Sequence, residues 1–493
     1  MSQHILAIDQ STSATKALLF DAYGTLIDQY VQSHHQYYPQ PGWVEHDAEE
    51  IYRHTLAVVG ELLAKHPQVS TDVLGLSITN QRETIVVFSR DTGQPLFRAI
   101  VWQCRRGDPI CQEMIRAGAE AEVQRLSGLK IDTYFPASKL KWLLEKEPSI
   151  RQQVLQGEAL IGTIDTYLIY RLTGGRVFAT DHTNACRTLL YDINTLAWSD
   201  TLCDLFGVPH QALPEIRESM AHFGETDCEG LLDHPIPICG VMGDSQAALF
   251  AQRCYIPGGA KITFGTGSSV LLNVGTLPVR SSHGIVTTIG WVYRNQAVYA
   301  FEGIINFTGA TITWMRDQLE LIRGSSETEI LAKSVPDNNG VYLVPAFVGL
   351  SAPYWRADVQ GAIVGLTPSS TRAHVVRAAL ESIAYQVRDV LTLMAQDAGI
   401  PLQMVQGDGG VVANRFLMQF TADMIGLRLR ASALPELSAL GAVFSGLLGL
   451  GIYTSLDELA ALPARFDDYH PALDAATVER FYAGWQRAVQ RVL

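Results

Sequence analysis

The sequence has no pair of closely spaced cysteines, although it contains seven cysteines among 493 residues. Cys104 and Cys111 are the nearest to each other, and the others are scattered along the chain. A zinc knuckle needs ligands only a few residues apart, and a disulfide framework needs an even, clustered set. The pattern predicts neither. We expect reduced thiols that are buried as small apolar side chains.

Positive charge is also scarce. Lys and Arg number 37 and Asp and Glu number 50, so the formal net charge is −13. Broad binding of nucleic acid requires a surplus of positive charge against the phosphate backbone, and this composition excludes it. An anionic ligand would have to be held by local groups.

Long apolar runs are absent as well. The best candidate for a membrane span is 437–453, which is too short and too rich in Gly, Ala and Ser to cross a bilayer. The segment indicates a closely packed interior helix instead. Asp9 follows the first short apolar run directly, which excludes a secretory signal peptide at that place. We therefore expect no membrane span and a cytoplasmic protein.

What the chain does contain is an apolar fraction of 47% over 493 residues, which suits two to four globular domains. Segments 5–20 and 260–274, about 255 residues apart, share a pattern: a strand, a loop of small and hydroxyl residues, and a second strand. Strands and helices such as 48–65 alternate between them, and 374–398 has helical spacing. The pattern predicts two α/β lobes of related design that meet near residue 250 and share a cleft. Two unrelated hairpins are the alternative.

The loops inside these two units carry groups that bind phosphate. Loop 9–16 combines a carboxylate, hydroxyls and a lysine, and loop 264–269 reads Phe-Gly-Thr-Gly-Ser-Ser. Amide and hydroxyl donors with a cation suit phosphate oxygens, and Asp9 suits Mg²⁺ held through water. A third glycine-rich segment, 406–414, precedes a helix whose N-terminus favours an anion. Each loop alone could be an ordinary turn, but two facing loops can grip a polyphosphate. The sequence has no P-loop signature.

Isolated polar residues in apolar surroundings are the other candidates. Arg82 and Glu83 follow a strand and offer donors and an acceptor to neighbouring hydroxyls. Trp102 and Tyr134 could form an aromatic wall with polar edges for a small polyol. Asp244 follows an apolar strand and can accept a hydroxyl proton during phosphoryl transfer. The alternatives are a structural salt bridge for the pair, core packing for the aromatics and a helix N-cap for Asp244.

Six longer segments resemble the FGGY family of carbohydrate kinases, and within it the glycerol kinases. They are PGWVEHD (41–47), ITNQRET (78–84), AIVWQCRR (99–106), TDHTNACRTLL (180–190), NGVYLVPAFVGLSAPYW (339–355) and ALESIAYQVRDVL (379–391). The resemblance covers essentially the whole chain. It implies an α/β fold of two actin-like (ribonuclease H-like) ATPase lobes, 1–250 and 251–493, around a central cleft that takes ATP, Mg²⁺ and a polyol.

The matching motifs imply a role for each candidate residue. Asp9 resembles the residue that organises Mg²⁺, through water, and Asp244 resembles the catalytic base. The positions that match polyol contacts are Arg82, Glu83, Trp102, Tyr134, Asp244 and Ser245. The positions that match nucleotide contacts are Thr12, Ser13, Lys16, Thr266, Gly309, Gly410 and Asn414. The implied reaction is ATP-dependent phosphorylation of a terminal hydroxyl of glycerol, giving glycerol 3-phosphate, by a homodimer or homotetramer.

Four positions depart from the family pattern. Ser245 stands where glycerol kinases usually carry Gln, and Ser269 stands where they often carry Phe. Both changes shrink a side chain, so we expect a roomier pocket that accepts a longer polyol or ketose, such as a tetritol, pentitol or ketopentose. Ser11 replaces the usual Gly, and Lys16 replaces the usual Arg, which keeps the charge but loses the bidentate fork. A nucleotide-driven clamp like actin is a further alternative, but a clamp needs no hydroxyl-binding groups in its cleft.

Overall fold

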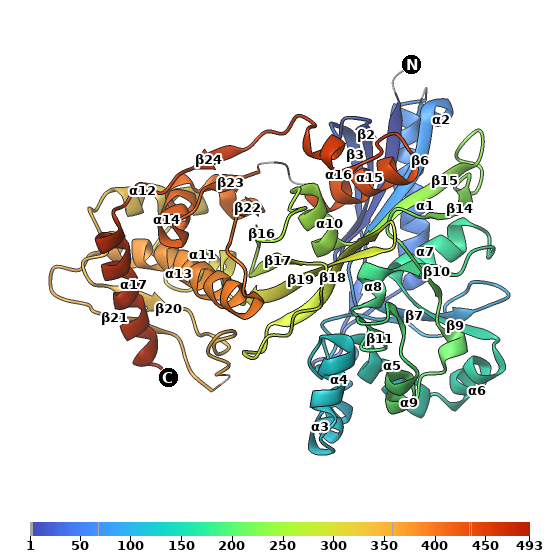
Figure 1. Ribbon diagram of the computed structural model, residues 1–493, viewed down its shortest axis with the longest axis horizontal. Coiled ribbons are helices and arrows are strands. Elements are labelled where there is room, and N and C mark those ends of the chain that lie inside the picture. Colours follow the sequence, from blue (N-terminus) through green and yellow to red (C-terminus); the bar gives the residue numbers. More distant parts are fainter. Residues whose placement is uncertain (1–2, 68, 357, 433, 435) are drawn as a thin grey trace.

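The structure is a computed structural model that describes residues 3–67, 69–356, 358–432, 434 and 436–493. Two mixed sheets, one in each lobe, form its framework (Figure 1). The strands of the first are β1 (His4–Gln10), β2 (Ala14–Asp21), β3 (Leu26–Ser33), β6 (Val73–Asn80), β14 (His222–Thr226) and β15 (Ile236–Gly243). Those of the second are β16 (Gly259–Phe264), β17 (Ser268–Gly275), β18 (Val286–Tyr293), β19 (Gln296–Ile305), β22 (Met404–Asp408), β23 (Leu429–Ala431) and β24 (Asp467–Tyr469).

The cores of the two sheets have the same topology. In the first sheet β1, β2 and β3 form an antiparallel meander, and β6 and then β15 continue parallel on the other side of β1. In the second sheet β16, β17 and β19 form the meander, and β22 and then β23 continue parallel to β16. The predicted fold class, an α/β protein of two actin-like lobes, is therefore confirmed, and the alternative of two unrelated hairpins is wrong.

Strand register brings the ends of the parallel strands to one edge of each sheet. In the first lobe Gln10, Asn80 and Gly243 lie side by side at the ends of β1, β6 and β15. These strands are apolar and fully buried along most of their length, as parallel strands covered on both faces are. The polar residues that follow them therefore emerge together. Ligands of open α/β sheets bind at this carboxyl edge.

The helix α15 (Leu437–Gly449) packs against the first lobe, although it follows the second lobe's strands in sequence. It contacts β15, β6 and β1, and it also packs on α10 (Asp244–Ala251). Figure 1 shows this red helix beside the blue strands. Most of its side chains are buried, so the prediction of an interior helix is confirmed. Among the described residues, none of the helices combines the length and the apolar character that crossing a membrane requires.

The remaining elements surround these two sheets. The outer part of the first lobe has β4 (Gln36–Tyr37), β5 (Glu45–His46), β7 (Ile85–Ser89), β8 (Ala99–Ile100) and β9 (Ala159–Thr163), with α1 (Ala48–Lys65), α3 (Asp108–Arg116), α4 (Glu120–Ser127), α5 (Pro136–Lys146), α6 (Pro148–Gln156), α7 (Ile164–Leu172) and α9 (Asp200–Phe206). The second lobe has α11 (Gly309–Asp317), α12 (Ser325–Lys333), α13 (Arg372–Ala398), α14 (Arg415–Ile425) and α17 (Ala475–Gln490), with the hairpin of β20 (Tyr342–Val344) and β21 (Ala362–Val364). The predicted helices 48–65 and 374–398 correspond to α1 and α13. All seven cysteines are free and buried, as expected.

The packing of α15 on α10 requires a glycine, which gives a test of this contact. A Cβ added at Gly441 would lie 1.8 Å from the backbone oxygen of Ala247 in α10. We expect Gly441→Ala to lower the free energy of unfolding by about 3 kcal/mol, because α10 and α15 must separate. Thermal and urea unfolding measure this loss. Gly324→Ala is the matched control, since a Cβ there meets nothing within 4 Å; equal losses in both variants would contradict the proposed packing.

Candidate active site

Two arginines and two glutamates form a buried ion network between the lobes. Arg82 and Glu83 follow β6, Arg187 belongs to the first lobe, and Glu302 lies on β19 of the second lobe. Arg82 Nη2 donates to Glu302 Oε1 at 2.7 Å, and Arg187 Nη1 lies 2.6 Å from Glu302 Oε2. Arg187 Nε donates to Glu83 Oε1 at 2.6 Å. The network thus connects the sequence-predicted pair to the opposite lobe.

The charges in this network balance each other away from water. Each of the four residues is at most 5% exposed, so an unpaired charge here would be costly. Burial acts to raise the pKa of Glu302, but Arg187 and Arg82 outweigh it and hold that pKa at about 2. For Glu83 burial prevails over Arg82 and Arg187, and its pKa is raised. Glu83 also has φ of 62°, a conformation rare outside glycine and typical of functional positions.

Asp244 stands at the first turn of α10, where β15 ends. Its Oδ1 lies 3.1 Å from Arg82 Nε, and its side chain is 41% exposed, unlike those of the buried network. The backbone N–H of Ser245 donates to the same oxygen at 2.6 Å. Gly243, and not Asp244, is the N-cap residue of α10, so the simple N-cap alternative is wrong. A positioned carboxylate at the open side of a buried arginine can accept a proton from a bound alcohol.

The two aromatic candidates form one wall that also contacts the first loop. The rings of Trp102 and Tyr134 lie 5.2 Å apart between centroids. Trp102 Nε1 donates to Thr12 Oγ1 at 3.0 Å. Burial, with Glu83 beside the ring, raises the pKa of Tyr134 well above its usual range and keeps its hydroxyl protonated. The alternative of plain core packing does not explain the indole's hydrogen bond to the loop.

The first loop carries a buried carboxylate and a shared lysine. Asp9 and Lys16 face each other across β1 and β2, with Lys16 Nζ 3.4 Å from Asp9 Oδ2. Lys16 Nζ also donates to Glu436 Oε2 at 2.6 Å, just before α15. Ser13 lies exposed at the loop tip, and His34 holds the loop by contacting the Thr12 carbonyl at 2.8 Å. The loop therefore presents an exposed hydroxyl and one cation above a buried carboxylate.

The second loop is joined to the start of α11. The N–H of Gly309 donates to the Gly265 carbonyl at 2.9 Å, and that of Thr308 donates to the Thr266 carbonyl at 3.0 Å. A Cβ at Gly309 would lie 2.7 Å from the Gly265 oxygen, so this close approach needs glycine. Thr266 itself is exposed at the loop tip. Its hydroxyl is available to an anion beside a helix N-terminus.

A cavity of about 780 Å³ in the second lobe brings three of the predicted nucleotide residues together. Gly309, Gly410 and Asn414 line it, between α11, α12 and the segment before α14. Asn414 Nδ2 donates to Thr328 Oγ1 at 3.0 Å, and its Oδ1 accepts from the Leu417 N–H at 3.0 Å. The volume of the cavity lies within the usual range for sites that bind cofactor-sized ligands. Thr266, Thr12, Ser13 and Lys16 do not line this cavity.

A second cavity of about 210 Å³ lies between the lobes, beside the ion network. Tyr134, Arg187, Glu302 and Ile304 line it, whereas Arg82, Glu83, Trp102 and Asp244 do not. At its rim Lys130 Nζ of the first lobe lies 3.5 Å from the ring centroid of Trp355 in the second. Both residues line the cavity, and their cation–π contact joins the lobes there.

Ser269 is paired with a residue that lines this cavity. It pairs with Ile304 across β17 and β19, and directly paired residues share a face of a sheet. Its hydroxyl is buried and finds no hydrogen-bond partner among the described residues. Ser245, in contrast, contributes only its backbone N–H to the contacts at Asp244.

Three residues of the site were not among the candidates. Arg187 lies inside one of the motifs that carried the resemblance. Glu302 is a single carboxylate within the apolar strand 296–305, and Glu436 is a single carboxylate directly before an apolar helix. An isolated charge in such surroundings is a usable signal, since buried charges are rare unless paired.

Two lobes of equal core topology, each with a loop of small and hydroxyl residues after its first strand, and a carboxylate held by a buried arginine are typical of two-lobed sugar-kinase-type phosphotransferases. The chain matches the N-terminal domain of the "FGGY family of carbohydrate kinases" over residues 4–251 and the C-terminal domain of that family over residues 260–450. The chain belongs to the FGGY family of carbohydrate kinases. The expected resemblance is thereby confirmed, and the protein is an enzyme of this family.

Named relatives share the full length of the chain. It is 45% identical over 493 residues to a glycerol kinase of Desulfitobacterium hafniense, with 100% of both chains covered. It is 47% identical over 488 residues to a glycerol kinase of Symbiobacterium thermophilum, covering 99% of this chain and 98% of the other. The crystal structure of Plasmodium falciparum glycerol kinase with ADP is 36% identical, with a TM-score of 0.95 over 100% of this chain and 98% of that one.

The buried carboxylate of Asp9 makes stability depend on pH. Burial raises its pKa from 3.8 to about 6, opposed by Lys16 and supported by Glu436 and Asp244. The folded state therefore holds this proton more tightly than the unfolded state, and stability falls as pH rises from about 4 to about 6. We expect Asp9→Asn to exceed the wild type in free energy of unfolding by up to about 3 kcal/mol above pH 6, and the difference to close toward pH 4. Urea unfolding across this range tests it, and a difference independent of pH would refute it.

Proposed function

We propose that the chain transfers the terminal phosphoryl group of ATP to a terminal hydroxyl of glycerol, giving glycerol 3-phosphate. The observation that carries the proposal is the position of Asp244. It is held at 3.1 Å from the buried Arg82, at the carboxyl edge of the first sheet, with its side chain 41% exposed. The full-length likeness to glycerol kinases supports the same substrate.

ATP fits the groups of the second lobe and the two loops. The 780 Å³ cavity, with Gly309, Gly410 and Asn414 in its wall, suits the nucleoside. Thr12, Ser13 and Lys16 on one side, and Thr266 on the other, offer hydroxyl, amide and cationic donors to the phosphates. Lys16 would exchange Glu436 for a phosphate oxygen when the nucleotide binds.

Mg²⁺ fits the donor set at Asp9. Its carboxylate is buried beside Lys16, and among the described residues no group of three His, Cys, Asp or Glu side chains forms a complete metal site. A single carboxylate suits Mg²⁺ that keeps several waters and binds chiefly to phosphates. The ion would neutralise charge on the phosphate oxygens during transfer.

Asp244 would act as the base in this reaction. Arg82 and the Ser245 N–H fix one of its oxygens, which leaves the other free to accept the proton of the alcohol. Arg82 and Glu83 would bind the neighbouring hydroxyls, and Trp102 with Tyr134 would cover the carbon face of the polyol. Positioning supplies most of the rate enhancement of phosphoryl transfer, so the rigidity of the ion network matters as much as the base.

A longer polyol or ketose is the second candidate substrate, on a specific observation. Ser269 pairs with Ile304, which lines the interlobe cavity of about 210 Å³, so a phenylalanine in its place would extend on the face of the sheet that borders this cavity. A tetritol, pentitol or ketopentose has carbons beyond the third that such space can take. An actin-like clamp fits less well, because the buried Arg82–Glu83–Arg187–Glu302 network has no purpose in a protein that only senses the nucleotide.

The family resemblance also supports a proposal about the oligomeric state and the cellular location. We infer a homodimer or homotetramer, a cytoplasmic location, and lobes formed by 1–250 and 251–493, except that α15 of the second segment packs on the first lobe. Seven free, buried cysteines fit a reducing compartment. The net charge of −13 supports a small-molecule substrate and no nucleic acid.

Substitution of the proposed base tests the mechanism. Asp244→Asn keeps the size of the side chain and removes its capacity to take the proton, so we expect kcat with glycerol to fall at least about 10²-fold. Glycerol and ATP binding, measured by calorimetry, should persist. The control is Asp204→Asn, an exposed carboxylate on α9, which should behave as the wild type. Turnover of Asp244→Asn within a few-fold of the wild type would show that another group is the base.

The role of Ser269 is tested by comparing substrates. In Ser269→Phe the ring fills space toward the cavity, so kcat/KM for erythritol and xylitol should fall about tenfold relative to glycerol. Ser269→Ala keeps the space and should keep the wild-type ratio. An ADP-release assay over glycerol, erythritol, xylitol and ketopentoses gives the ratios. Exclusive use of glycerol by the wild type would end the second candidate.

A further inference from the structure

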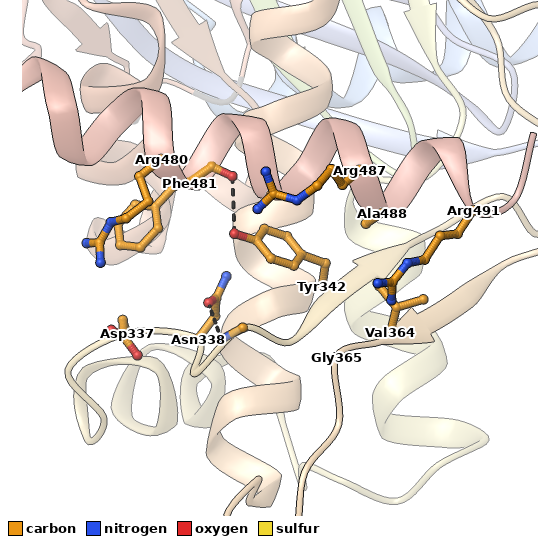
Figure 2. Close-up of a pocket in the computed structure, with 12 residues that line it drawn as sticks. Asp337, Asn338, Tyr342, Val364, Gly365, Arg480, Phe481, Arg487, Ala488 and Arg491 are labelled. Atoms are coloured by element: carbon orange, nitrogen blue, oxygen red, sulfur yellow. Dashed lines mark hydrogen bonds between the residues drawn. The ribbon is translucent and has the colours of Figure 1, made fainter.

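A groove at the far end of the second lobe contains an unusual concentration of arginine. It lies between α17 and the hairpin of β20 and β21 (Figure 2), at the end of the molecule away from the first lobe (Figure 1). Its volume is about 300 Å³, and it shares no lining residue with the two cavities at the proposed active site. Arg480, Arg487 and Arg491 line it from one face of α17 and its C-cap. Their spacing of seven and four residues keeps all three on that face.

Small residues on the same face create the hollow. Gly484 and Ala488 lie between the arginines and line the groove. A Cβ at Gly484 would lie 1.9 Å from the hydroxyl oxygen of Tyr342, so glycine lets that ring lie under the helix. Tyr342 donates its hydroxyl to the Phe481 carbonyl at 3.2 Å, which fixes the ring as the floor of the groove (Figure 2). The groove therefore has an aromatic floor and arginines at its rim.

The three arginines of the groove are not held by direct pairing with carboxylates among the described residues. Within the described part of the chain, none of them forms an ion pair with a carboxylate, although the protein has a net charge of −13. Glu479, the carboxylate on the neighbouring face of α17, pairs with Arg388 at 2.5 Å. An unpaired cluster in an acidic protein attracts anions locally. Arginine in particular binds phosphate through its planar fork of donors.

The two ends of the groove differ in charge. Arg487 and Arg491 lie one helical turn apart, close enough for both to contact one phosphate group. Asp337 and Asn338 line the other end, near Arg480 (Figure 2). The Asp337 carboxylate repels a phosphate and accepts hydrogen bonds from hydroxyls. Between the ends, Val364 and the Tyr342 ring offer apolar contact to carbon atoms.

We propose that this groove binds a small phosphate monoester that carries hydroxyl groups, such as a sugar or polyol phosphate. The phosphate lies between Arg487 and Arg491, the carbon chain lies over the Tyr342 ring, and the hydroxyls face Asp337. The size of the groove limits the ligand to a few carbons more than a triose, since it is at the lower end of ligand-site volumes. The site is separate from the cleft and does not depend on the identity of the kinase substrate.

Calorimetric titration of the full-length protein with glucose 6-phosphate tests the proposal. The variant R487Q/R491Q removes both phosphate donors, and R116Q/R151Q, with exposed arginines on α3 and α6 of the first lobe, removes the same charge elsewhere. We expect saturable binding to the wild type and the control, and binding about tenfold weaker or worse in R487Q/R491Q. The kinase rate without added ligand should be the same in all three proteins, which shows that they are folded.

Two further titrations separate the phosphate from the rest of the ligand. Glucose should not bind at the groove, and inorganic phosphate should bind more weakly than glucose 6-phosphate, because it lacks hydroxyls for Asp337. Equal binding of the sugar phosphate by all three proteins would place it elsewhere, for instance on the phosphate loops, and would overturn the proposal. Absence of saturable binding to the wild type would do the same. Phosphate bound as tightly as the sugar phosphate would refute the recognition of hydroxyls.

Discussion

The neutral set of Arg82, Glu83, Arg187 and Glu302 is the constraint on which the rest of the site depends. Its members come from both lobes and are almost fully buried, so opening the cleft separates Glu302 from two guanidinium groups. Removal of one partner from such a set leaves an uncompensated buried charge, which is far more costly than the loss of a surface pair. The set therefore stabilises this relative position of the lobes, and with it the position of the carboxylate that Arg82 holds.

The repeated sheet topology explains where the candidate functional residues lie. Each lobe ends its parallel strands at one edge, and each places a loop of small and hydroxyl residues after its first strand. When two such sheets face each other, the loops approach a shared space from opposite sides. Backbone segments can approach each other closely in such loops only where the side chains are small. The glycines at 265, 267 and 309 accordingly lie close to backbone atoms of neighbouring residues. The third glycine-rich segment, 406–414, which precedes α14, borders the proposed nucleotide cavity.

The sequence was sufficient for the parts of the site that lie within a few residues of a strand end. Asp9 stands near the end of one apolar strand, and Arg82 and Asp244 follow two others, so their position near a sheet edge could be predicted, as could α1, α13 and α15. Their partners could not. Glu302 lies 220 residues from Arg82, and Glu436 lies 420 residues from Lys16. No periodicity connects such pairs, because only the folded arrangement of two lobes brings them into contact. The hydrogen bond between Trp102 and Thr12 could not be predicted either, because the two residues were assigned to different ligands.

The return of α15 to the first lobe has a mechanical meaning. The chain passes from the first lobe to the second between α10 and β16, comes back between β23 and α15, and leaves again before β24 pairs with β23. We expect these repeated covalent connections to resist sliding of one lobe past the other and to leave rotation between the lobes as the softer motion. A protein built this way cannot be divided into two independently expressed halves at the middle of its sequence without stripping a helix from the first sheet.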